Sequence, residues 1–315
     1  MNKITKFIIK LAISVLFLLW IVYRVNWQEV LALLVQIKIT YIILYFIILL
    51  IGIAISAQKW RMLAKFKGIE LSFSSFFKFY LAGTFVNNFM PSFIGGDTFR
   101  AYQIGKAEKK YAQAASSVVM DRLTGLFGAM LLTLLFSLMN FSAISSNYIL
   151  MVLNAGVLFS LLAIILFFAT RKMLFWQKIT SSSTLKIGKY IPEKILKFIA
   201  EMTHYHNNTG VLWQAVAWSM AFSMIGLAAA NFVLFLALGV QINMLDYLSV
   251  IFLISFISAM PISINNIGVK EWAYVTFFGF FGVSTAIVIT VAILSRFLQM
   301  LLSFFALPVY LGSKK

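Results

Sequence analysis

The sequence predicts an all-α, polytopic membrane protein with about six full transmembrane helices and two re-entrant helical hairpins that form an inverted repeat. Three observations lead to this prediction. The 315 residues are 62% hydrophobic, and the mean hydropathy is +0.96, which is far above the range of soluble domains. Apolar runs long enough to cross a bilayer recur along the chain. Two polar, proline-containing motifs interrupt these runs.

Positive charge indicates the topology. The formal net charge is +17, and most of the 26 Lys and Arg lie in stretches that the alternation of apolar runs places on one side. Arg24 and Lys38 are the cations in loops on the other side. Because cytoplasmic loops carry the excess of Lys and Arg, we expect both termini in the cytoplasm of a bacterial cytoplasmic (inner) membrane. The basic charge therefore requires no nucleic-acid partner, and the absence of cysteine excludes disulfides and thiolate chemistry.

Residues 1–315 are expected to form one transmembrane domain. Asn26 is a candidate cap of a short amphipathic helix on the outer surface. Residues 171–208 form a basic cytoplasmic segment whose apolar face we expect to contact the anionic inner leaflet. The six full spans are expected at about residues 7–23, 41–57, 116–139, 148–169, 211–238 and 287–309.

The two polar motifs predict the hairpins. The first, at residues 87–100, reads NNFMPSFIGGDTFR, and positive charge flanks it on both sides. The second, at residues 261–271, reads PISINNIGVKE, and no basic cluster follows it. Proline and paired glycines break a helix, and hydrocarbon offers no water to satisfy the freed backbone groups, so such segments line cavities. We therefore expect one hairpin to enter from the cytoplasm and the other from the outside.

The spacing of charges indicates an internal repeat. Asp97 precedes Arg122 by 25 residues, and Glu271 precedes Arg296 by 25 residues. The two units, at about residues 73–139 and 246–310, would have opposite orientations. Inverted repeats with broken helices are typical of alternating-access transporters. The alternative is that the equal spacing arose by chance in a chain with few acidic residues.

These motifs resemble the lysylphosphatidylglycerol synthase/flippase transmembrane-domain family. The resemblance implies a polytopic lipid-handling protein, in a family whose membrane domain is associated with moving aminoacylated phospholipid between leaflets. The chain ends at Lys315, shortly after its last predicted span, so the resemblance implies a stand-alone membrane domain without synthase activity. The matching residues are Asn87-Asn88 with Pro91, Gly95-Gly96-Asp97, Arg100, Asp121-Arg122, Gly125-Leu126 and Pro261 through Gly268 to Glu271.

Polar side chains at membrane depth are the candidate substrate-binding residues. A charge there costs at least ~2.5–3.5 kcal/mol on insertion scales, so it marks a pathway or has a partner. Arginine suits phosphate because its planar fork donates two parallel hydrogen bonds. The alternatives are buried ion pairs that lock helices together and amides that satisfy broken backbone. The candidates are Asn87, Asn88, Asp97, Arg100, Asp121, Arg122, Asn265, Asn266, Glu271 and Arg296.

The predicted function is a flippase-like transporter that moves a phosphate-bearing lipid head group through a polar cavity between the hairpins. We expect no enzymatic activity, no cofactor and no metal, since His204 and His206 have no other His or Cys to complete a site. Membrane lipids are the expected partners, with self-association left open. One alternative is a membrane-embedded glycosyl- or head-group transferase acting on a polyprenyl-phosphate or phospholipid. Another is a non-transporting scaffold for a lipid-modifying partner.

Overall fold

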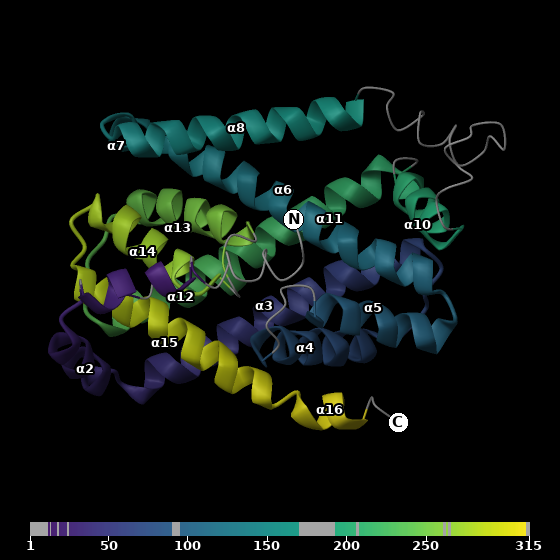
Figure 1. The fold of residues 1–315 in the computed structure, drawn as a ribbon, viewed down its shortest axis with the longest axis horizontal. Coiled ribbons are helices and arrows are strands. Elements are labelled where there is room, and N and C mark those ends of the chain that lie inside the picture. The colour runs from purple at the N-terminus through teal and green to yellow at the C-terminus, as the bar shows by residue number, and fades with distance from the viewer. Residues whose placement is uncertain are drawn as a thin grey trace.

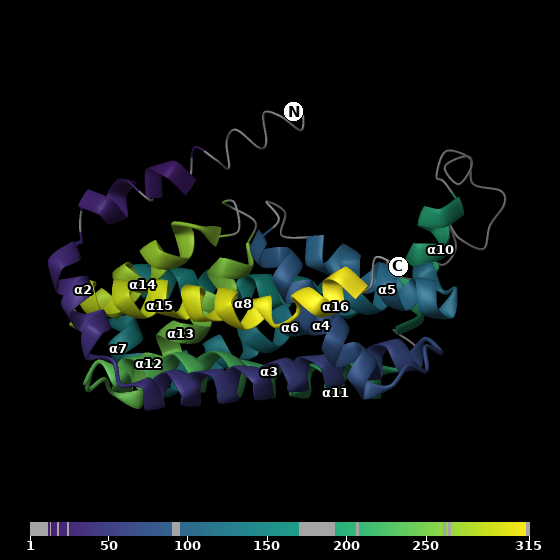
Figure 2. The same cartoon turned by 90° about the horizontal axis from the view of Figure 1, so that it is seen from below.

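The long helices pack side by side and run roughly along the long axis of the molecule (Figure 1), whereas α2 (Trp27–Gln36) and α10 (Glu193–His204) run across it (Figure 2). The computed structural model describes residues 12, 14–17, 19–23, 25–89, 95–169, 193–205, 208–260, 263 and 266–312. Within these residues no β-strand occurs, which confirms the predicted all-α class. The helices in chain order are α2 (Trp27–Gln36), α3 (Ile39–Phe66), α4 (Phe73–Phe89), α5 (Gly95–Glu108), α6 (Tyr111–Met139), α7 (Phe141–Ser145), α8 (Tyr148–Ala169), α10 (Glu193–His204), α11 (Thr209–Phe222), the π-helix η3 (Ser223–Ala229), α12 (Ala230–Ala237), α13 (Met244–Ala259), α14 (Val269–Gly279), α15 (Thr285–Phe304) and α16 (Leu307–Gly312).

A multi-pass membrane protein is confirmed by the length and composition of these helices. Five of the six predicted spans coincide with helices long and apolar enough to cross a bilayer. The predicted span at residues 7–23 lies partly outside the described residues. The helix Ser14–Tyr23 meets α2 at 85°, and this bent pair would count as a sixth span. The five are Ile39–Phe66, Tyr111–Met139, Tyr148–Leu166, Thr209–Ala237 and Thr285–Phe304.

The distribution of apolar side chains agrees with a lipid environment. On α8, side chains such as Phe159 and Leu166 are exposed at the surface, as expected where hydrocarbon replaces water around the molecule. Most of α13 is buried instead, packed among α6, α14 and η3.

Asn26 caps α2, because its side-chain oxygen accepts from the Glu29 amide at 3.4 Å. The cap agrees with the sequence-based expectation.

Two halves of the chain run in opposite directions. Figure 2 shows α3 running toward the end that holds α4 and α5, whereas α11, η3 and α12 run toward the end that holds α13 and α14. The helix pairs α4–α5 and α13–α14 therefore lie toward opposite ends of the molecule, and each coincides with a predicted hairpin. Whether these pairs are re-entrant in a membrane, and whether the halves form an inverted repeat, stays a prediction.

The two halves are in close backbone contact where α3 crosses η3. A Cβ atom added at Gly52 would lie 2.6 Å from the Gly226 Cα atom, and one added at Gly226 would lie 2.8 Å from the Gly52 Cα atom. Neither position has room for a side chain, so both glycines are required for this backbone contact. Gly226 lies within the π-helical turn Ser223–Ala229. π-Helical turns are rare in proteins, and many of those that occur lie at functional sites.

Helix α10 is held against α3 and α6 by a polar cluster. The Lys67 ammonium donates to Glu201 Oε2 at 2.9 Å and lies 3.0 Å from His204 Nδ1. Gln113 on α6 donates to the other Glu201 oxygen at 2.8 Å. Burial lowers the pKa of the Lys67 ammonium, and Glu201 opposes that shift by accepting its hydrogen bond. The ring of His204 stacks on Phe66. The amphipathic helix is thereby anchored to the protein, and its contact with the inner leaflet stays a prediction.

Replacing Gly52 with valine should destabilise the crossing of α3 and η3. The new side chain would collide with backbone atoms that cannot rotate away, so we expect a loss of roughly 1–3 kcal/mol of stability. Thermal unfolding in detergent measures this loss. Gly156→Val is the matched control, because a Cβ at Gly156 meets no atom within 4 Å. Equal unfolding temperatures for the two variants would contradict the assigned contact.

Replacing Glu201 with alanine should release α10. The substitution removes the acceptor of the nearly inaccessible Lys67 ammonium, whose side chain is 1% exposed, and local opening becomes cheaper. We expect amide hydrogen exchange over residues 193–204 to accelerate roughly tenfold or more. The exposed Glu70→Ala on the same side of the molecule should leave that exchange unchanged. Unchanged exchange in Glu201→Ala would show that other contacts hold α10.

Candidate functional site

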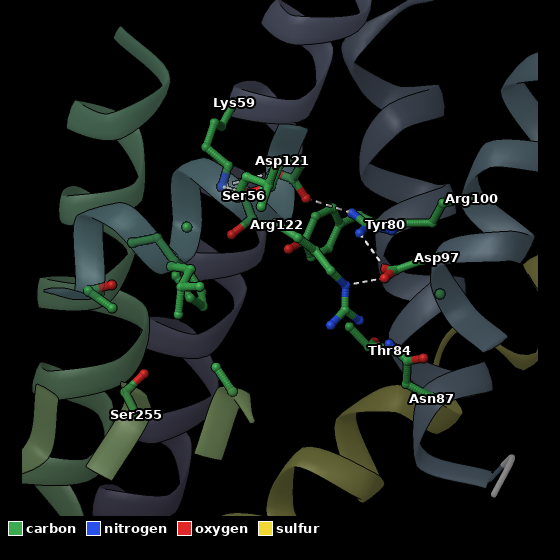
Figure 3. A pocket seen from close by; sticks show the side chains of 18 residues that line it. Ser56, Lys59, Tyr80, Thr84, Asn87, Asp97, Arg100, Asp121, Arg122 and Ser255 are labelled. Carbon is green, nitrogen blue, oxygen red and sulfur yellow. Dashed lines mark hydrogen bonds and ion pairs between the residues drawn. The ribbon is translucent and has the colours of Figure 1, made fainter. Parts of the chain in front are cut away.

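A cavity of about 410 Å³ lies between the α4–α5 pair, α3, α6 and the region of η3 and α13. Its wall combines charged, hydroxyl, amide and apolar side chains, and Figure 3 shows the charged ones gathered on one side of it. The lining residues that matter most for its chemistry are Ser56, Lys59, Tyr80, Thr84, Asn87, Asp97, Arg100, Asp121, Arg122, Ser223 and Ser255. Five of these, Lys59, Asp97, Arg100, Asp121 and Arg122, carry formal charges and are called the Asp97 cluster below.

Lys59 and Asp121 join α3 to α6. The Lys59 ammonium lies 2.9 Å from Asp121 Oδ1 and donates to the Asp121 carbonyl at 2.8 Å. A third contact goes to Ser219 Oγ on α11 at 3.0 Å. Asp121 Oδ1 is held by this charge contact without the angular alignment of a hydrogen bond. Both side chains are at most 7% exposed, so each depends on the other for neutralisation.

Arg100 occupies the centre of the cluster. Its guanidinium donates to Asp97 Oδ1 at 2.7 Å and to Asp121 Oδ2 at 3.2 Å. The guanidinium carbon lies 4.3 Å from the ring centroid of Tyr80 and 5.0 Å from that of Trp60. Stacking on aromatic faces suits arginine because its weakly hydrated, planar cation interacts with the ring quadrupole. Arg100 is therefore a fixed, buried member of the wall.

Arg122 is the accessible cation of the cluster. Its side chain is 42% exposed, whereas that of Asp97 is 10% exposed, and Arg122 Nε forms an ion pair with Asp97 Oδ2. Asp97 is the third residue of α5, where the N-terminal end of the helix dipole favours a carboxylate. Each oxygen of Asp97 thus faces a different arginine (Figure 3).

Close packing of α4 on α5 positions Asp97. A Cβ atom at Gly96 would lie 2.1 Å from the Gly83 carbonyl oxygen, so the two helices approach at a contact that only glycine permits. Asn87 Oδ1 accepts from the Gly96 amide at 2.8 Å. This bond satisfies one of the amides that the start of α5 leaves without an intrahelical acceptor. Asn88 instead donates to Ser303 on α15 at 3.1 Å.

A second charged cluster occupies the α14–α15 contact. Arg296 donates to Glu271 Oε1 from Nε at 2.9 Å and from Nη2 at 2.7 Å. Glu271 Oε2 accepts from the Gly268 amide at 2.8 Å. Asn266 donates to the Ser258 carbonyl, and its own carbonyl accepts from Arg296 at 3.4 Å. Asn266, Lys270, Glu271 and Arg296 form what is called the Glu271 cluster below.

The structure brings most of the sequence-predicted residues into these two clusters. Asn87, Asp97, Arg100, Asp121 and Arg122 line the cavity. Asn266, Glu271 and Arg296 contact one another, Asn88 binds α15 away from the cavity lining, and Asn265 lies outside the described residues. Both predicted acid–arginine pairs, spaced by 25 residues, are ion pairs. In both, the acid is the third residue of the second helix of its pair.

Sequence reasoning missed three residues of this site. Lys59 follows the predicted span at residues 41–57, which would place it in a cytoplasmic loop, but α3 continues to Phe66 and buries it. Trp60 and Tyr80 were not singled out. One signal was present, because Ser56, Lys59, Trp60 and Leu63 recur at helical spacing, and all four are buried on one face.

Comparison with known proteins identifies the family. The model of the lysylphosphatidylglycerol synthase TM region matches residues 7–306. The chain is 29% identical to the UPF0104 membrane protein MJ1595 of Methanocaldococcus jannaschii, over 98% of this chain and 94% of that protein. It is 25% identical to the UPF0104 membrane protein PH1989 of Pyrococcus horikoshii, over 95% and 92%. Neither name states an enzymatic activity, and no solved structure gives a significant match. The chain belongs to the family of the lysylphosphatidylglycerol synthase transmembrane region.

Proposed function

We propose that this protein moves the phosphate-bearing head group of a lipid between the leaflets of the membrane, with the cavity as the head-group site. The observation that carries the proposal is the Asp97 cluster, five charged side chains on the wall of a 410 Å³ cavity that two long apolar helices, α3 and α6, help to enclose. Charges at membrane depth are expensive and mark substrate pathways. A head group in the cavity would leave its acyl chains in the surrounding lipid.

Arg122 is the proposed phosphate-binding residue. Its exposure is the largest among the paired charges of the cluster, and guanidinium groups bind phosphate through parallel hydrogen bonds. Asp97 would orient it, since a carboxylate on Nε fixes the plane of the guanidinium. Lys59 and Arg100 are nearly buried and would act through the field they create rather than by contact.

An inverted repeat would give the transport mechanism, and three features support it. The numbers of Gly52 and Gly226, of Asp97 and Glu271, and of Arg122 and Arg296 all differ by 174. The first pair touches at the crossing of the two halves, and the other two pairs form equivalent ion pairs. The α4–α5 and α13–α14 pairs lie toward opposite ends (Figure 2). Such repeats transport by exposing a central site alternately to each side.

The proposed orientation places the end that carries α10 in the cytoplasm. Lys65, Lys106 and Lys109 lie with α10 at that end, on the C-terminal turns of α3 and α5 and directly after α5. The excess of positive charge supports this placement by the positive-inside rule. In this orientation α10 would lie at the anionic inner leaflet of the cytoplasmic membrane.

The transferase and scaffold alternatives would each use the charged residues in a different way. A polyprenyl-phosphate transferase would use acidic groups that hold a metal, and among the described residues no group of three or more His, Asp and Glu could hold one. Both carboxylates of the cavity are paired with cations. A scaffold would use the charges only to hold helices together, which transport and stability measurements on the same variants can separate.

Reconstituted protein should translocate a fluorescent phospholipid, and the site variants should not. We expect Arg122→Ala, Asp97→Asn and Glu271→Gln each to reduce the rate of translocation in proteoliposomes at least about tenfold, the effect of losing a charge-assisted hydrogen bond. Chemical quenching of the outer-leaflet fluorophore gives the rate. Lys106→Ala, an exposed charge removed from α5, is the matched control and should keep the wild-type rate.

Wild-type rates in all three site variants would reject the transport proposal. Formation of a covalent lipid product from a labelled polyprenyl-phosphate donor would favour the transferase instead. Either result is read directly from the same vesicles.

Stability and transport should separate within the Asp97 cluster. Asp121→Asn leaves Lys59 and Arg100 with less counter-charge in a buried position, so we expect a loss of roughly 3–5 kcal/mol of stability. Arg122→Gln removes a half-exposed cation, so we expect a stability change within about 1 kcal/mol together with loss of transport. Thermal unfolding and the vesicle assay provide the two readouts. Parallel losses in both variants would support the scaffold.

A further inference from the structure

We infer that the cavity selects lipids whose head group carries a single net negative charge, as in a phosphodiester without an ammonium group, and that Lys59 sets this selection. The inference rests on the proposed function and names its substrate class. Three cations, Lys59, Arg100 and Arg122, line the cavity with two carboxylates, Asp97 and Asp121. One formal positive charge is therefore uncompensated. In a low-dielectric wall an uncompensated charge is costly until an anion arrives.

The carboxylates of the cavity are not available to an ammonium group. Asp97 faces Arg100 with Oδ1 and Arg122 with Oδ2. Asp121 faces Lys59 with Oδ1 and Arg100 with Oδ2. All four carboxylate oxygens thus already lie against a cation of the protein, and both residues are buried. A lipid ammonium would have to displace one of these cations or sit beside it, and like charges brought together cost several kcal/mol.

Lys59 supplies the third positive charge, which gives the Asp97 cluster its formal net charge of +1. Its ammonium is fixed by contacts to the Asp121 carboxylate, the Asp121 carbonyl and Ser219 Oγ, and its side chain is 7% exposed. Without Lys59 the formal charges of the two arginines and the two carboxylates would cancel. Lys59 is thus a specificity-determining residue that acts through its charge.

The rest of the wall suits a hydroxylated, uncharged head-group tail. Ser56, Thr84, Ser223 and Ser255 bring hydroxyl groups to the cavity (Figure 3 labels three of them). Hydroxyl groups donate and accept hydrogen bonds with alcohols but do not neutralise a cation. The Asn87 amide oxygen is already occupied by the Gly96 amide. Phosphate at Arg122 with hydroxyl groups along these side chains matches a polyol phosphodiester.

The Glu271 cluster repeats the charge excess. Lys270 and Arg296 stand against the single carboxylate of Glu271, whose Oε1 binds Arg296 and whose Oε2 accepts from Gly268. Lys270 donates to Ser295 Oγ at 3.4 Å and lies 5.5 Å from the Tyr274 ring centroid. A head group that passes from one cluster to the other would therefore meet the same sign of charge in both.

Lipid binding to the purified full-length protein tests this selection. We would titrate detergent-solubilised protein with phosphatidylglycerol, phosphatidylethanolamine and lysyl-phosphatidylglycerol, and measure occupancy by native mass spectrometry. Phosphatidylglycerol is expected to bind at least about tenfold more tightly than either ammonium-bearing lipid, because of like-charge repulsion in the cavity. The preference should persist at high ionic strength, which screens adsorption to exposed basic residues.

Substitutions assign the preference to the cavity. Lys59→Gln makes the cluster formally neutral, so the preference should fall to about threefold or less. The double variant Lys59→Met with Asp121→Asn is the matched control, because it removes both charges, keeps one net positive charge and should keep the preference. Arg122→Gln also neutralises the cluster at a half-exposed position and gives the same readout if Lys59→Gln fails to fold.

The outcomes separate the inference from the proposed function. Equal wild-type affinity for phosphatidylglycerol and lysyl-phosphatidylglycerol overturns the charge selection and leaves lipid translocation standing. A preference that survives both Lys59→Gln and Arg122→Gln also overturns it, because the selection would then arise elsewhere. No saturable binding of any of the three lipids overturns the proposed function, and the inference with it.

Discussion

The cost of placing charge among apolar helices is the constraint on which the site depends. The residues that carry these charges come from α3, α5 and α6, and none of those helices could hold its charged side chain in isolation. Asp97 and Asp121 each accept two cations, so three helices are tied together by two carboxylates. The network stabilises the cavity wall and also determines the sign of its field.

Much of this arrangement was predictable, because local features of the sequence specify it. The five spans follow from hydropathy, and the breaks between α4 and α5 and between α13 and α14 coincide with proline-containing motifs. The equal spacing of Asp97 and Arg122 and of Glu271 and Arg296 singled out the residues that form two ion pairs. An acid near the start of one helix and an arginine within the next can meet when the helices are antiparallel neighbours, which chain order alone suggests.

The sequence could not specify the tertiary contacts between side chains on different helices. The positive-inside rule counts a lysine near the end of an apolar run as a loop residue, but α3 extends nine residues beyond the predicted end of its span and carries Lys59 inward. The contact of Arg100 with Tyr80 joins α5 to α4, and its contact with Trp60 joins α5 to α3. No pattern within one segment reveals such stacking. The pairing of Asp121 with both Lys59 and Arg100 was hidden for the same reason.

The position of α3 explains how two separated clusters can belong to one mechanism. Lys59 binds Asp121 in the Asp97 cluster, whereas the Tyr45 hydroxyl donates to the carbonyl of Ser295, which precedes Arg296 of the Glu271 cluster. These two contacts lie roughly 21 Å apart along a single helix. Between them Gly52 meets Gly226 in the π-helical turn of the other half. Because packed helices rearrange between discrete arrangements rather than deforming continuously, a change at either cluster in the proposed transport mechanism would move α3 against this glycine contact. The proposed mechanism therefore couples the two halves at this crossing.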